Sequence, residues 1–221
     1  MLLRTLAVSV GSFLVTTTNA EIVQCNVNAN AQCGPCTGTG DCNLKCQIIM
    51  EVCMESIFQC QADTACVIDC KSELACESSL IYALTVPSLT MNCDGDESCA
   101  STVISLGSGA DVTINCGADS GCLEMQLNAQ SANNVVINCD GPEACKAMNI
   151  ICGSGDCLIN CNDAGASPCS SMILNCGTSS NCQIDCTMNA ITQNPKCPSL
   201  ELSVGTSLSP LICIQIRFVN T

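Results

Sequence analysis

The sequence contains no histidine and no tryptophan, and its 221 residues include only one tyrosine and three phenylalanines. Without histidine, the common mixed cysteine–histidine zinc sites are excluded. The side chain that most often serves as a catalytic general acid or base is missing as well. An ordinary globular core draws much of its buried area from aromatic side chains. Some other device must therefore hold this chain together.

Positive charge is also scarce. Six lysines and arginines stand against 20 aspartates and glutamates, which gives a formal net charge of −14 at pH 7. A chain this acidic repels phosphate backbones, which argues against a nucleic-acid partner. Solubility is the ordinary consequence of such charge, and binding of cations or basic partners is the alternative.

No hydrophobic run is long enough to span a membrane. Residues 1–20 predict a secretory signal, with a basic start at Arg4, a short apolar stretch and small residues at Thr18 and Ala20. Near the other end, residues 211–219 are too short and too polar for a span and make a poor lipid-anchor signal. We expect this segment to cap the exposed sheet edge of the last coil. A secreted, extracellular or cell-surface protein is predicted.

Cysteine is what the chain has in excess, with 25 copies. In a secreted protein this density indicates disulfides rather than metal thiolates. Cys-x-Cys is absent, and Cys-x-x-Cys occurs once, at Cys33 and Cys36. We expect no metal and no cofactor. The odd count leaves at least one cysteine free or bonded to another chain, and Cys213, isolated in the tail, is the first candidate.

A triplet of an aliphatic residue, Asn and Cys recurs five times, and a second Cys follows each copy. The triplet cysteines lie 23, 23, 22 and 15 residues apart. A fixed period of this size indicates stacked repeats, in which one coil buries its apolar face against the next. The copies are Met91-Asn92-Cys93, Ile114-Asn115-Cys116, Ile137-Asn138-Cys139, Ile159-Asn160-Cys161 and Leu174-Asn175-Cys176.

The clearest unit runs from residue 112 to 134. Residues 112–116 alternate apolar and polar like a strand with one buried face, 117–121 have turn composition, 123–127 alternate again, and 130–134 turn the chain. Strands repeated in this way without helices lie parallel, about 4.8 Å apart. The prediction is an all-β fold, a right-handed parallel β-helix (solenoid) with disulfide-stapled coils. An antiparallel sandwich is the alternative, although hairpins need no long period.

Four regions are predicted: the signal at 1–20, a cysteine-rich N-terminal region of degenerate coils at 21–90, regular repeats at 91–186, and a C-terminal cap or tail at 187–221, where prolines interrupt the pattern. Three details accompany this division. Cysteines spaced by seven leave a short helix open for residues 46–60. Residues 77–90, without cysteine, are expected to form a longer coil or a loop. The short step from Cys161 to Cys176 predicts one tighter coil.

Cys-x5-Cys occurs seven times and flanks turns rich in Gly, Asp and Ser. We favour disulfides that close each turn within one coil, and pairing between stacked coils is the alternative, because strand spacing also fits disulfide geometry. Each such bond contributes roughly 2–4 kcal/mol by restricting the unfolded chain. The candidates are Cys36 with Cys42, Cys60 with Cys66, Cys70 with Cys76, Cys93 with Cys99, Cys116 with Cys122, Cys139 with Cys145, and Cys176 with Cys182.

Two rows of polar side chains follow from the repeat. The triplet asparagines, Asn92, Asn115, Asn138, Asn160 and Asn175, are predicted to form an outward ladder that stabilises the stack, with a ligand-facing array as the alternative. Acidic residues gather in the turns. Solvated turn acids are the default interpretation, and weak calcium binding is the alternative. These acids are Asp94, Asp96, Glu97, Asp119, Asp140, Glu143 and Asp163.

The repeat also has a family resemblance. Residues 91–99 and 137–145 best carry the form aliphatic-x-Cys-x-Gly-x-x-x-Cys, while 114–122 and 174–182 move the Gly next to the first Cys. Over roughly residues 58–186 the chain resembles a group of uncharacterised cysteine-rich β-helix proteins, secreted or on the surface of unicellular eukaryotes. The resemblance implies a β-solenoid, and it implies no assigned activity and no catalytic residues.

We expect a non-enzymatic secreted protein with a structural, adhesive or recognition role. Its expected partners are an extracellular glycan or protein surface, with self-association through the solenoid ends or an unpaired cysteine. A carbohydrate-active β-helix enzyme, a polysaccharide lyase or hydrolase, is the alternative, but no acid pair stands out from the turn acids. An ice-binding solenoid is the second alternative. It is disfavoured because Thr113 has Val136, not Thr, in register.

Overall fold

The structure is a computed structural model that describes residues 20–24, 32–33, 41–46, 53–60, 65–162, 167–188, 201–203 and 214–220. Side chains are described for residues 44–46, 53–60, 65–162 and 167–186. The predicted signal at 1–20 lies outside the described residues, apart from Ala20, and so do Cys36, Asp163 and Cys213.

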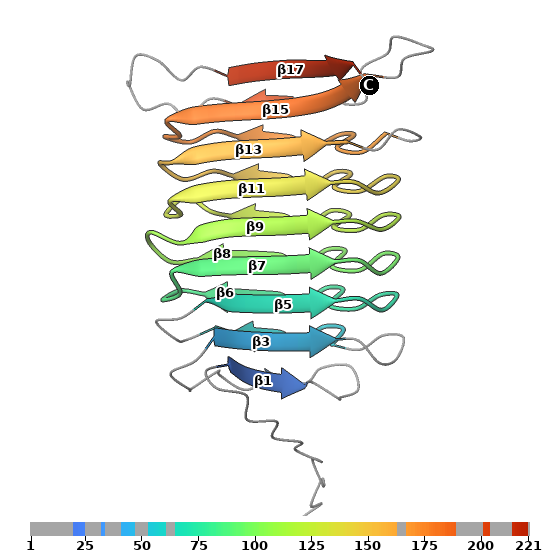
Figure 1. The fold of residues 1–221 in the computed structure, drawn as a ribbon, viewed down its shortest axis with the longest axis vertical. Coiled ribbons are helices and arrows are strands. Elements are labelled where there is room, and N and C mark those ends of the chain that lie inside the picture. Colours follow the sequence, from blue (N-terminus) through green and yellow to red (C-terminus); the bar gives the residue numbers. More distant parts are fainter. Residues whose placement is uncertain are drawn as a thin grey trace, which may run out of the picture.

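Two parallel sheets form the fold (Figure 1). In the described part of the chain, sheet A has nine strands: β1 (Ala20–Gln24), β3 (Asp41–Cys46), β5 (Cys66–Cys70), β7 (Ser88–Cys93), β9 (Asp111–Cys116), β11 (Asn134–Cys139), β13 (Asp156–Cys161), β15 (Asn181–Met188) and β17 (Ile214–Asn220). Sheet B has eight described strands: β2 (Gln32–Cys33), β4 (Ile57–Gln59), β6 (Leu80–Ala83), β8 (Val103–Leu106), β10 (Gln126–Asn128), β12 (Asn149–Ile151), β14 (Ile173–Asn175) and β16 (Glu201–Ser203).

The strands of each sheet stack in sequence order, so the predicted all-β parallel solenoid is confirmed. Sheet A strands run to the right in front in Figure 1, and sheet B strands return to the left behind as the chain climbs, which makes the coil right-handed. Each coil therefore contributes one strand to each sheet. From β3 to β15, one cysteine per strand stands in the same register position of sheet A, in the series Cys46, Cys70, Cys93, Cys116, Cys139, Cys161 and Cys186.

Alternation of side chains builds the interior. In β11 the inward residues Val135, Ile137 and Cys139 are at most 1 % exposed, while the residues between them are partly exposed. Strands β7, β9 and β13 repeat the pattern. Phe58 is the only aromatic side chain among the described core residues, and aliphatic, methionine and cysteine side chains fill the rest. Stacking of near-identical coils thus replaces the aromatic core that the composition lacks.

The N-terminal region belongs to the same stack. Strand β4 and the turn at residues 53–55 replace the helix left open for residues 46–60, of which 47–52 lie outside the described residues. Residues 77–90 contain β6 and the start of β7, both paired on each side, and so form an ordinary coil rather than a loop. Aliphatic residues replace cysteine there, and the strands keep the same register with their neighbours.

One copy of the aliphatic-Asn-Cys triplet lies in a different sheet from the other four. Leu174 and Asn175 lie in β14 of sheet B, beside Ile150 and Ile151, whereas the other four triplets lie in sheet A. Sheet A continues directly from Cys161 to Cys186, so this coil is longer than the one before it rather than shorter. The prediction of a tighter coil between Cys161 and Cys176 is therefore wrong, because Cys176 stands at the opposite corner of the coil from Cys161.

The turns after sheet A are stacked as regularly as the strands. Glu97 N–H donates to Asp119 O at 2.9 Å, and Cys122 N–H donates to Ser98 O at 2.9 Å, so neighbouring turns are hydrogen-bonded to each other. Alternate residues adopt the left-handed conformation, such as Glu97, Cys99 and Ser101 with φ of 52°, 58° and 54°. The equivalent turn of the next coil continues past Cys122, so β10 begins at Gln126 rather than at residue 123.

Candidate functional site

A column of disulfides occupies the corner where sheet A ends. The register aligns the last cysteine of β3, β5, β7, β9, β11 and β13, and each is bonded to a cysteine of the following turn. Each bond joins residues six to eight positions apart and closes a turn within one coil. The pairs are Cys46–Cys53, Cys70–Cys76, Cys93–Cys99, Cys116–Cys122, Cys139–Cys145 and Cys161–Cys169.

The opposite corner carries disulfides only towards the two ends of the described stack. They are Cys60–Cys66, Cys152–Cys157 and Cys176–Cys182. In the coils between them, the row of Cys66 continues through Leu89, Val112 and Val135 before it reaches Cys157. Apolar packing thus substitutes for the disulfide where the coils are most regular.

Six of the seven candidate pairs are joined in the structure as cysteines six residues apart. For the seventh, Cys36 and the Cys42 side chain lie outside the described part of the chain. Sequence spacing missed Cys46–Cys53, Cys152–Cys157 and Cys161–Cys169, whose separations are 7, 5 and 8. Turn length varies there, and only the register shows that the partners are equivalent. Cys186 is disulfide-bonded as well.

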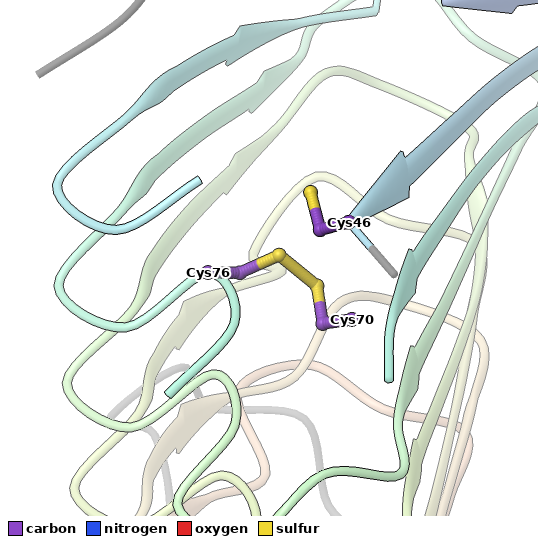
Figure 2. Close-up of side chains that lie close together, drawn as sticks. All are labelled: Cys46, Cys70 and Cys76. Atoms are coloured by element: carbon purple, nitrogen blue, oxygen red, sulfur yellow. A yellow bond between two sulfur atoms is a disulfide. The ribbon is translucent and has the colours of Figure 1, made fainter. Parts of the chain in front are cut away.

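Sulfur atoms of adjacent coils come close at two points of the column. Cys46 lies beside the Cys70–Cys76 disulfide in Figure 2, and all three sulfurs lie within 4.8 Å of one another. The triplet of Cys139, Cys161 and Cys169 has the same property. Such groupings suit metal thiolates, but thiolates are the ligands and these sulfurs are bonded in disulfides. These groups of three sulfurs arise because one disulfide stacks on the next.

The outward asparagines of sheet A form a hydrogen-bonded ladder. Nδ2 of Asn160, Asn138 and Asn115 each donates to Oδ1 of the preceding rung, at 2.7, 2.7 and 2.8 Å. Asn92 ends the series by donating to Asp69 Oδ1 at 2.6 Å. The predicted rung at Asn175 is wrong, because Asn175 lies in sheet B and accepts from Gly177 N–H. Asp185 takes its place in the sheet A register.

We predict that Asn115→Ala lowers the free energy of unfolding by about 1 kcal/mol, because water replaces part of the two lost hydrogen bonds. In the double variant Asn115→Ala/Asn138→Ala, the shared bond is lost only once. The double loss should therefore fall short of the sum of the single losses by about 0.5 kcal/mol or more. Urea unfolding of the wild type, Asn115→Ala, Asn138→Ala and the double variant measures the four free energies of unfolding. Strictly additive losses would show that the bond between Asn138 and Asn115 contributes nothing.

The turn acids line the corner beyond the disulfide column. The six that the structure describes, Asp94, Asp96, Glu97, Asp119, Asp140 and Glu143, are exposed or partly exposed. Lys146 bonds Glu143 at 2.8 Å and Lys71 lies 4.0 Å from Asp94, both at the surface where such pairs contribute little. Among the described residues, the groups of metal-type side chains with converging ligand atoms are the two cysteine triplets. The described turn acids belong to neither group.

Ser98 is an irregularity inside the column corner. Its side chain is fully buried, and its Oγ has no hydrogen-bond partner among the described residues. The residue before the turn cysteine is Ala75, Gly121 or Ala144 in neighbouring coils. We predict that Ser98→Ala raises the free energy of unfolding by about 1 kcal/mol, since it removes an unpaired buried hydroxyl. A lower unfolding midpoint in urea would show instead that the hydroxyl is bonded.

The outer faces of the two sheets differ in character. Beside the asparagine ladder, sheet A presents a row in which Thr90 and Thr113 are neighbours and Val136 and Leu158 follow. In sheet B, β4 and β6 carry the exposed apolar side chains Ile57 and Tyr82. A pocket of about 460 Å³ lies there, lined by Gln59, Cys60, Tyr82, Leu84 and Thr85.

Comparisons with protein-family models, curated proteins and solved structures gave no match. The described residues include no helix of the length and apolar character that crossing a membrane would require. The chain is a cysteine-rich, disulfide-bonded β-solenoid built of repeats, and its extensive disulfide bonding is consistent with an extracellular protein.

Proposed function

We propose that the chain is a non-enzymatic secreted protein whose solenoid serves a structural, adhesive or recognition role outside the cell. The proposal rests on the equivalence of the coils. Coil after coil repeats the same disulfide, the same ladder rung and the same acidic turn. Catalysis needs one constellation of differing groups, whereas a scaffold or a repetitive binding surface needs many equal ones.

The composition of the faces supports contact with an extracellular glycan or protein surface. Asp111 and Asp156 begin their strands, whereas the rows from Thr90 to Leu158 and from Asn92 to Asn160 expose uncharged amide, hydroxyl and aliphatic groups in the middle of sheet A. The ladder fixes the orientation of its amides, which lowers the entropy lost on binding. Asparagine amides have further hydrogen-bonding capacity beyond the ladder bonds, at a spacing set by the strands.

Secretion and membership of the cysteine-rich β-helix group of unicellular eukaryotes are part of the same proposal. The predicted signal at 1–20 and the disulfides support secretion. The repeat form at residues 91–99 and 137–145 supports membership. Self-association through the solenoid ends or an unpaired cysteine would extend the scaffold.

A binding panel tests the proposal. The purified protein is applied to immobilised glycans and extracellular proteins, with calcium and with a chelator, and the same polysaccharides are assayed for new reducing ends or unsaturated products. We expect binding without turnover, weakened by the sheet A variant Thr113→Lys and unchanged by Ser108→Lys in an exposed turn. Turnover of an acidic polysaccharide would overturn the assignment as a non-enzyme.

A further inference from the structure

The sulfur triplets place a second sulfur beside an intact disulfide at two steps of the column. Cys46 lies in β3 directly beside Cys70 of β5, and its sulfur is within 4.8 Å of both sulfurs of Cys70–Cys76 (Figure 2). Cys139 has the same relation to Cys161–Cys169. All of these residues are fully buried. The described column thus has sulfur neighbours both within a coil and between coils.

Both kinds of neighbour satisfy the geometry of a disulfide. The Cα atoms of Cys70 and Cys76 are 6.0 Å apart within one coil. Register partners on adjacent parallel strands, such as Cys46 and Cys70, are separated by about 4.8 Å. Bonded cysteines span roughly 4.4–6.8 Å between Cα atoms. A bond between coils is therefore accessible without moving the strands.

We propose that the disulfide column undergoes internal thiol–disulfide exchange, which converts staples within a coil into staples between coils. A Cys46 thiolate attacks Cys70 Sγ, the Cys70–Cys76 bond breaks, and its electron pair leaves on Cys76, which takes up a proton. The products are a Cys46–Cys70 disulfide and a Cys76 thiol, so the exchange consumes neither oxidant nor reductant. In the intact protein, a small dithiol that reduces Cys46–Cys53 supplies the first thiolate.

The consequence is a redox response built into the fold, and it goes beyond the proposed function. Reduction of one staple leaves the chain cross-linked, because the neighbouring coil takes over the sulfur. The new bond closes a loop that spans a whole coil instead of a single turn, which restricts the unfolded chain more strongly. Partial reduction thereby shifts cross-linking from single turns to the stack.

The variant Cys53→Ala tests the exchange without any added reductant. The full-length protein is held near pH 8 for a day, quenched in acid, alkylated and mapped by mass spectrometry. We expect a Cys46–Cys70 linked peptide and alkylated Cys76, at about a tenth of the molecules or more, because an isomer about 1.4 kcal/mol less stable still holds that share. Alkylation at Cys46 alone, beyond the sites labelled in the wild-type protein, overturns the proposal.

Two further proteins secure the result. Cys145→Ala makes the same test at the other triplet, with a Cys139–Cys161 peptide and alkylated Cys169 expected, and it stands in should Cys53→Ala not fold. Cys46→Ala/Cys53→Ala has no attacking sulfur, so Cys70–Cys76 should stay intact in it. Alkylated Cys76 in this control would show that the bond opens by another route and would overturn the assignment to Cys46.

Discussion

Reduction of the disulfides in excess dithiol, without denaturant, is expected to unfold the solenoid. A closed loop of about seven residues contributes roughly 2 kcal/mol by restricting the unfolded chain. The nine bonds of the described residues together then exceed the net stability of about 5–15 kcal/mol that ordinary domains have. The interior cannot make up the loss with aromatic packing, since Phe58 is its only described aromatic side chain.

Far-UV circular dichroism measures this result. The β-strand signal and the cooperative thermal transition should both disappear in the reduced protein, while the oxidised protein in the same buffer keeps them. A reduced chain that retains the strand signal and melts cooperatively would show that strand stacking alone holds the fold.

Gly141→Ala is expected to lower the free energy of unfolding by about 3 kcal/mol, the upper part of the usual range for overpacking. A Cβ at Gly141 would lie 2.0 Å from Ala118 O and 2.5 Å from Ala118 C, which are backbone atoms of the coil below. That backbone is fixed, because the turns of neighbouring coils are hydrogen-bonded to each other, as in Asp140 N–H to Cys116 O. The turn must separate from its neighbour to admit one methyl group.

Gly117→Ala is the matched control in the neighbouring coil. A Cβ there meets only Asp94 Oδ1 at 3.2 Å, and this side-chain atom can move aside. We expect a change within about 0.5 kcal/mol, as for ordinary surface substitutions. Urea unfolding of the two variants separates the cases, and equal losses would show that the coils are not packed at Gly141 as described.

The strands were predictable because the burial of one strand face produces an alternation of apolar and polar residues in the sequence. Alternation in residues 112–116 and the constant step from Cys93 to Cys116 to Cys139 follow from one buried face and one neighbouring coil. Both survive in β9 and its register with β7 and β11. The coil without cysteine, with Leu89 in the row of Cys66, was harder to recognise. There the apolar volume is kept while the residue that marks the period is lost.

The turns and one triplet were not predictable, for different physical reasons. Glu97, Cys99 and Ser101 adopt left-handed conformations although none of them is glycine, because hydrogen bonds to the neighbouring coils on both sides hold them. Leu174-Asn175-Cys176 has the same letters as the ladder triplets, because an outward Asn beside a corner Cys suits either sheet. Only pairing distinguishes the sheets. Asp69 and Asp185, at the two ends of the asparagine series, lie outside the aliphatic-Asn-Cys pattern because Asp replaces Asn there.

A disulfide map of the purified, oxidised protein by mass spectrometry tests the central claim most directly. The claim is that each cysteine at the end of a sheet A strand closes the turn of its own coil. The map should contain short-range pairs, among them Cys93–Cys99, Cys116–Cys122 and Cys161–Cys169. Pairs that join distant parts of the chain, such as Cys93 with Cys182, would contradict the solenoid.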